Sequence, residues 1–103
     1  MRFLTDEDFD SVIKSGIALV DFFADWCGPC RMMEPVIEEL SVEMEGKAVV
    51  AKINVDEYSN IASKFQIFSI PTLIIFKDGK ESERIVGAVG KSEIINKLTK
   101  YIS

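Results

Sequence analysis

The 103-residue sequence contains no histidine and only two cysteines, Cys27 and Cys30. Without an imidazole the chain cannot form a Ser-His-Asp triad or a Cys-His pair. A structural zinc site takes four ligands, so two thiolates would need carboxylates or dimerisation to complete one. A bond between cysteines only two residues apart closes too small a loop to staple a loop-rich secreted fold. We therefore expect neither a bound metal nor another cofactor.

Long apolar segments and basic clusters are also missing. The longest apolar runs, such as residues 17–20 and 48–51, are far shorter than the roughly 20 residues that a membrane span needs. The N-terminus shows no apolar h-region and no small-residue cleavage site, which argues against a secretory signal. The net charge is −5, and the dispersed lysines and arginines form no basic stripe for phosphate backbones. We expect a cytoplasmic protein that binds neither membranes nor nucleic acid.

The length and a hydrophobic content of 48% fit one domain over residues 1–103. Apolar periodicity and capping residues predict helices over 5–16, 27–44, about 61–65 and 91–102. β-Branched and aromatic runs predict strands over 17–24, 48–55, 72–76 and 83–89, with a hairpin turn at Asp78-Gly79 and a short edge strand near Phe3. Strands that alternate with helices predict an α/β fold: a central mixed β-sheet of four to five strands, flanked by helices on both faces.

The most informative motif is Trp26-Cys27-Gly28-Pro29-Cys30, which follows a predicted strand and opens a predicted helix. A helix N-terminus carries partial positive charge and unpaired N–H groups, so we expect a lowered pKa and a nucleophilic thiolate at Cys27. Cys30 lies one turn further along the same side. We predict that Cys27 attacks a substrate disulfide and that Cys30 resolves the mixed disulfide. An inert buried pair, or half of a metal site, is the alternative interpretation.

The two residues between the cysteines bear on the direction of the reaction. Gly28-Pro29 carries no charge, whereas a histidine there would stabilise the thiolate and make the pair more oxidising. The motif therefore favours a reductant over an oxidase.

Several segments together resemble the thioredoxin family. Residues 20–30 (VDFFADWCGPC) resemble its active-site segment, residues 51–56 its central strand, and Ile70-Pro71-Thr72 its cis-proline loop. Residues 77–79 and 86–88 match its later turn and glycine. The motifs keep the family's order and spacing, and the resemblance extends over nearly the whole chain. The resemblance implies the thioredoxin fold and a monomeric protein-disulfide reductase, which acts on disulfide-containing proteins and receives electrons from a thioredoxin reductase.

By position, Asp21 resembles the family's buried acid and Lys52 its charge partner. Asp21 interrupts an apolar strand, so burial should raise its pKa and suit it to exchange a proton with Cys30. The alternative for Asp21 is a strand-end carboxylate that reaches solvent. The alternative for Lys52 is a strand lysine whose ammonium simply extends to water.

The resemblance also implies a cis Ile70–Pro71 bond that faces the cysteines and leaves the Ile70 backbone free to pair with an extended substrate strand. A flat apolar patch for partners is expected around it, although ordinary packing is the alternative for each member. The members are Trp26, Gly28, Pro29, Ile70 and Gly87.

Three residues depart from the family's usual pattern and bear on partner preference. Phe23 stands where tryptophan is common, Ser69 where a glycine often precedes Ile-Pro, and Phe68 adds bulk beside it. Two other functions remain open from the sequence: a glutaredoxin-like enzyme that uses glutathione, and a module that binds partners without chemistry. The Gly-Pro pair and the absence of an obvious basic cluster disfavour the first, and the intact cysteine pair disfavours the second.

Overall fold

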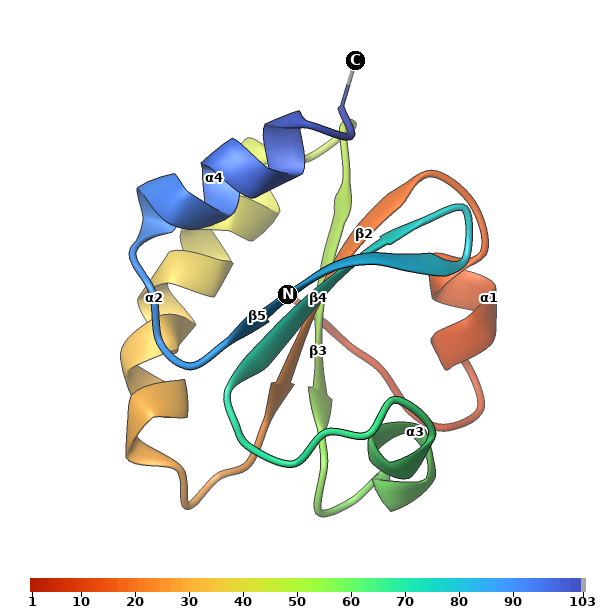
Figure 1. The fold of residues 1–103 in the computed structure, drawn as a ribbon, viewed down its shortest axis with the longest axis vertical. Coiled ribbons are helices and arrows are strands. Elements are labelled where there is room, and N and C mark those ends of the chain that lie inside the picture. Colours follow the sequence, from red (N-terminus) through yellow and green to blue (C-terminus); the bar gives the residue numbers. More distant parts are fainter. Residues whose placement is uncertain (103) are drawn as a thin grey trace.

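A computed structural model describes residues 1–102, in which five strands form one sheet in the order β1-β3-β2-β4-β5 (Figure 1). Neighbouring strands β1, β3 and β2 are parallel, whereas β4 runs antiparallel to β2 and β5 antiparallel to β4. The mixed α/β sheet predicted from the sequence is therefore confirmed. The strands span Arg2–Phe3 (β1), Ile17–Phe23 (β2), Val49–Asn54 (β3), Thr72–Lys77 (β4) and Lys80–Val86 (β5).

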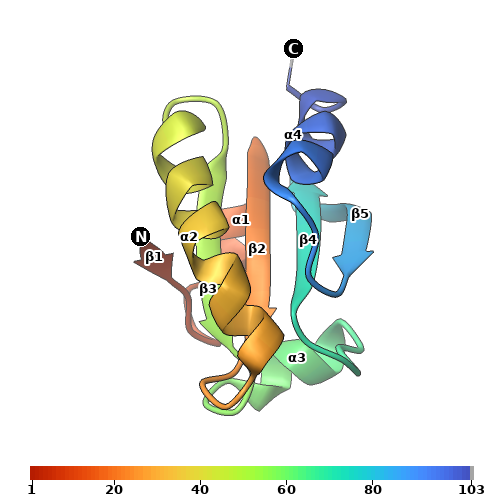
Figure 2. The ribbon, with the colours of Figure 1, turned by 90° about the vertical axis from the view of Figure 1, so that its left-hand side faces the viewer.

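Helices cover both faces of the sheet, with α2 and α4 on one face and α1 and α3 on the other (Figures 1 and 2). Side chains alternate along a strand, so Leu19 packs into the core cluster with α2 and α4, while Val20 packs into the cluster with α1. Both strand residues are fully buried. The helices span Phe9–Ile13 (α1), Gly28–Glu43 (α2), Ser59–Lys64 (α3) and Lys91–Thr99 (α4).

Several element boundaries differ from the sequence prediction, and two of the differences have a clear local reason. The last strand, predicted over 83–89, begins at Lys80 because Asp78 and Gly79 both adopt positive φ angles and turn the chain within two residues. The first helix begins at Phe9 because Thr5 and Asp8 close the preceding turn: each backbone N–H donates to the other's side chain.

The predicted edge strand at Phe3 is confirmed, with Phe3 in register with Lys52 of β3. The last helix ends at Thr99, short of the predicted residue 102. No helix within residues 1–102 is both long and apolar enough to cross a membrane.

Candidate active site

The cysteine pair lies where β2 ends and α2 begins. Cys27 is the N-cap residue of α2, and the backbone N–H of Cys30 donates to the Cys27 sulfur at 3.2 Å. A disulfide joins the two residues. The position predicted from the sequence, at the mouth of a long helix, is therefore confirmed, and a sulfur at Cys27 receives an N–H group that α2 itself leaves unpaired.

Exposure does not distinguish the two sulfurs, because each cysteine is only 3% exposed. The residues around the two sulfurs, however, differ. Cys27 lines a surface pocket of about 440 Å³, and its sulfur lies 3.7 Å from the Ile70 carbonyl oxygen. Cys30 does not line this pocket; it packs with Cys27, Phe23 and Ala24 in a small core cluster. Of the two cysteines, Cys27 is therefore the one that faces this pocket.

The walls of this apolar pocket contain most of the docking residues predicted from the sequence. Trp26, Gly28, Pro29 and Ile70 all line it, whereas Pro71 and Gly87 do not. Gly87 lies beside the loop instead and donates its N–H to the Pro71 carbonyl at 2.8 Å. The remaining lining residues are Cys27, Val55, Ile67, Phe68 and Ser69.

Two large side chains project most strongly at this surface. Phe68 is 91% exposed and Trp26 is 68% exposed. The Trp26 indole N–H donates to the Asp56 carboxylate at 2.8 Å, which fixes the orientation of the ring. The Ile70–Pro71 peptide bond is cis, as the resemblance implied.

Asp21 lies in β2, in register with Lys52 of β3. Its carboxyl group is fully buried, and neither oxygen has a hydrogen-bond partner among residues 1–102. This burial raises the pKa of Asp21 from 3.8 to about 7; the Lys52 ammonium opposes the rise and the Glu34 carboxylate adds to it. The predicted burial is confirmed, and a solvated strand-end aspartate is excluded.

The comparison with known proteins agrees with this geometry. Residues 1–100 match the family model named Thioredoxin. The chain belongs to the thioredoxin family. It is 50% identical over 99 residues to thioredoxins of Staphylococcus aureus strains Mu50 and MW2, an alignment that covers 96% of this chain and 95% of each relative.

Among solved structures, a mutant thioredoxin from Halobacterium salinarum NRC-1 superposes with a TM-score of 0.92 at 36% identity. The superposition covers 99% of this chain and 90% of that one. The thioredoxin fold expected from the sequence is thus confirmed, and so is the function: the protein is a dithiol thiol–disulfide oxidoreductase that uses the Cys27–Cys30 pair.

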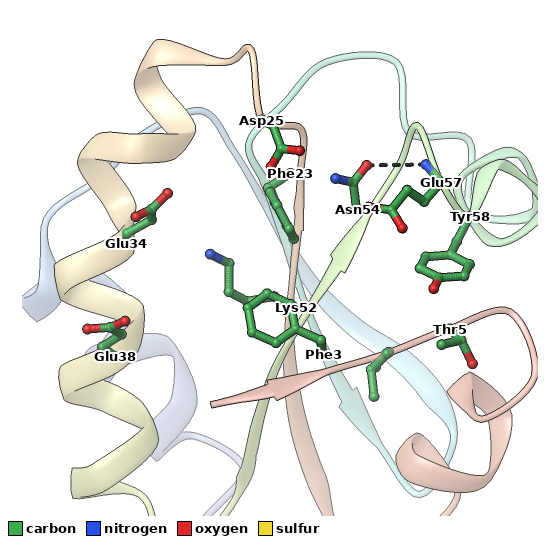
Figure 3. Close-up of a pocket in the computed structure, with 11 residues that line it drawn as sticks. Phe3, Thr5, Phe23, Asp25, Glu34, Glu38, Lys52, Asn54, Glu57 and Tyr58 are labelled. Carbon is green, nitrogen blue, oxygen red and sulfur yellow. Dashed lines mark hydrogen bonds between the residues drawn. The ribbon is translucent and has the colours of Figure 1, made fainter.

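Lys52 of this thioredoxin is held in an aromatic setting. Its ammonium lies 4.4 Å from the centroid of the Phe23 ring and 5.5 Å from that of Phe3, and the residue is 7% exposed (Figure 3). Cation–π attraction is strongest where water is displaced. Within residues 1–102 no carboxylate lies within 4.0 Å of it as an ion pair. Lys52 is therefore a strand neighbour of Asp21 without a direct salt bridge.

Phe3, Phe23 and Lys52 share a second pocket, of about 470 Å³, on the α2 side of the sheet (Figure 3). Glu34 and Glu38 of α2 also line it. Sequence reasoning missed this pocket because its walls come from four separate elements and no motif joins them. Over residues 1–102 no group of three or more His, Cys, Asp or Glu side chains is arranged to hold a metal ion.

Proposed function

We propose that this thioredoxin reduces disulfide bonds of other proteins, with Cys27 as the attacking and Cys30 as the resolving residue. The observation that carries the assignment is the position of Cys27 as the N-cap of α2, with the Cys30 N–H on its sulfur and the apolar pocket in front of it. A thiolate there is stabilised by the helix N-terminus and by a charge-assisted hydrogen bond.

The reaction then takes two exchange steps. The Cys27 thiolate forms a bond to one substrate sulfur while the substrate S–S bond breaks, and the released thiolate takes a proton. Cys30 gives up its thiol proton and attacks the Cys27 sulfur, which forms the Cys27–Cys30 disulfide and expels the second substrate thiolate. Two electrons pass from the protein to the substrate, and a reductase must return them.

Asp21 is proposed as the group that takes the proton from Cys30, directly or through water. A carboxyl group with a pKa of about 7 is ionised in part of the molecules at neutral pH and can both accept and return a proton. Lys52, beside it in the register, is proposed as the cation that keeps the ionised form accessible. Burial alone would hold the proton on Asp21 more tightly.

The proposed docking surface is the apolar pocket with the cis-proline loop. An extended segment of the partner would lie against the Ile70 backbone, with its disulfide above Cys27 and its apolar side chains against Trp26 and Phe68. Pro29 and Gly28 keep the approach to the sulfur free of charge. Pro71 supplies the cis bond of this loop, and the Gly87 N–H donates a hydrogen bond to the Pro71 carbonyl.

The proposed setting is the cytoplasm, where thiols are kept reduced, with the chain acting as a monomer of one domain.

Insulin reduction in the presence of dithiothreitol tests the activity directly: this protein should accelerate precipitation of the insulin chains. A module that only binds partners would leave the rate unchanged. Turnover with a thioredoxin reductase but not with glutathione would distinguish it from a glutaredoxin-like enzyme.

Alkylation should reveal which sulfur is the nucleophile. With the protein reduced and iodoacetamide limiting at pH 7, we expect Cys27 to be labelled well before Cys30, because only Cys27 is both at the helix mouth and in the pocket wall. Peptide mapping by mass spectrometry gives the two rates. Faster labelling of Cys30 would reverse the assigned roles.

Phe68 should matter for protein substrates and not for small ones. Phe68→Ser is expected to lower kcat/KM for insulin about fivefold, the equivalent of roughly 1 kcal/mol of lost apolar contact. Turnover of a small aromatic disulfide should stay near the parent value. Val42→Ser is the matched control, because Val42 is an exposed apolar residue of α2 that does not line the pocket. An equal loss in both variants would remove Phe68 from the docking surface.

A further inference from the structure

The geometry points to Glu34 as a second charged group that acts, from α2, on the proton that Asp21 exchanges with Cys30. This inference rests on the proposed proton-transfer role of Asp21 and adds a positioning residue to it. No sequence motif marks Glu34, and its side chain is exposed. Its position in α2 gives it this role.

The first observation is the face of the sheet on which the Asp21 and Lys52 side chains lie. Asp21 follows Leu19 by two residues on β2, so its side chain points to the same face as Leu19, which packs in the cluster with α2. Its register partner Lys52 lies on that face too, two residues beyond Val50 of the same cluster. The carboxyl and the ammonium group are therefore both enclosed between the sheet and α2.

The second observation is the helix spacing. Glu34 follows Cys30 by four residues in α2, so the two side chains lie one above the other on the same side of the helix. Glu34 and Lys52 also line the same pocket, and Figure 3 shows the Lys52 side chain directed from β3 toward α2, where Glu34 extends from the helix. On this side of the sheet, Asp21 therefore has a cation on the neighbouring strand, and Glu34 places an anion on the helix that covers the same side.

The third observation is the lack of any other partner for Asp21. Both its oxygens are unpaired among residues 1–102, so no hydrogen bond masks the effect of nearby charges. The buried position of Asp21 favours such an influence, because protein around a buried group screens a nearby charge less than water alone would.

The charged groups near Asp21 come from several surrounding elements. The β3 strand supplies Lys52 and the α2 helix supplies Glu34 and Glu38, while β4 places the apolar Leu73 opposite Asp21. Asp25 and Glu57 line the same pocket from the segments that follow β2 and β3. Of the acidic groups, Glu34 is the one whose charge raises the pKa of Asp21. Glu38, one turn further along α2, serves as its matched control.

The test compares Glu34→Gln, Glu34→Asp and Glu38→Gln. Glu34 and Glu38 are exposed, so each variant should fold. In the oxidised protein, the carboxyl ¹³C signal of Asp21 is titrated by NMR; in the reduced protein, single-turnover insulin reduction is followed against pH. Glu34→Gln should move the Asp21 midpoint to lower pH by roughly half a unit, and the acid limb of the rate profile with it. Glu34→Asp should keep most of the parent behaviour.

Two outcomes separate failure of this inference from failure of the proposed function. If Glu34→Gln and Glu38→Gln shift the Asp21 midpoint equally, or neither shifts it, Glu34 has no special position and the inference is overturned. If Asp21→Asn shows the parent rate profile, the proton-transfer role of Asp21 is wrong. The NMR midpoint then still reports whether Glu34 acts on Asp21.

Discussion

Cys27→Ser should lose all disulfide reduction, leaving only the background of dithiothreitol, whereas Cys30→Ser should lose turnover but keep the first exchange step. The difference follows from the order of the two steps. A serine at position 27 offers no thiolate to attack the substrate. A serine at position 30 leaves the Cys27 thiolate on the helix N-terminus intact but removes the sulfur that resolves the mixed disulfide. Cys30→Ser should therefore accumulate covalent adducts with protein substrates.

Non-reducing gels and intact-mass spectrometry check this. After incubation with an excess of a disulfide-containing protein, Cys30→Ser should appear as a one-to-one adduct that dithiothreitol dissolves, and Cys27→Ser should remain free. The double variant is the control for noncovalent association. Adducts of equal yield in both single variants would show that either sulfur can attack, and the two-step order would have to be abandoned.

The features that the sequence predicted well are those set by local pattern. Ile17–Phe23 is a buried strand because its residues are β-branched, aromatic or apolar on both faces, and Asp21 stands out within it as the one polar residue. The Asp78-Gly79 turn requires positive φ angles, which these two residues accept at little cost. The cysteine motif carries its own helix N-terminus, so its position in the fold followed directly.

The features that the sequence missed depend on packing between distant segments. The side chains of Phe3 and Phe23 approach each other and Lys52 only because β1 and β2 flank β3. The position of Glu34 relative to Lys52 depends on how α2 crosses the sheet, which residue spacing within one helix does not determine. Val55 and Ile67 reach the docking pocket from loops, where apolar periodicity gives no signal.

Asp21→Asn should change stability with a distinct dependence on pH. In the unfolded chain Asp21 ionises near its ordinary pKa of 3.8, whereas burial raises its pKa in the folded protein to about 7. Between these two values the folded state holds a proton that the unfolded state has lost, so the free energy of unfolding of the parent falls as pH rises through this window. The fall levels off above the folded pKa. A difference of about three pKa units corresponds to on the order of 4 kcal/mol.

Asparagine has no proton to lose, so the variant should not show this fall. Its buried amide carries a desolvation cost of its own, but that cost does not depend on pH. The stability of Asp21→Asn relative to the parent should therefore rise from pH 4 to pH 8, and the variant should be the more stable protein at the upper end. Denaturant midpoints of the oxidised proteins across this range measure the difference. Asp25→Asn removes an exposed charge near the same site and should show no comparable trend.

The same substitution should slow the chemistry while it stabilises the fold. Cys30 must lose its proton before it attacks the mixed disulfide, and within residues 1–102 Asp21 is the carboxyl group that lies fully buried on the α2 side of the sheet. Without this base, single-turnover reduction at pH 7 should fall at least about tenfold, since positioned general bases typically contribute more than that. A variant that is as fast as the parent but more stable would show that burial of Asp21 destabilises the fold without serving proton transfer. A variant that is slower and no more stable at pH 8 would mean that the carboxylate is better solvated in the folded protein than its enclosed position between β2 and α2 indicates.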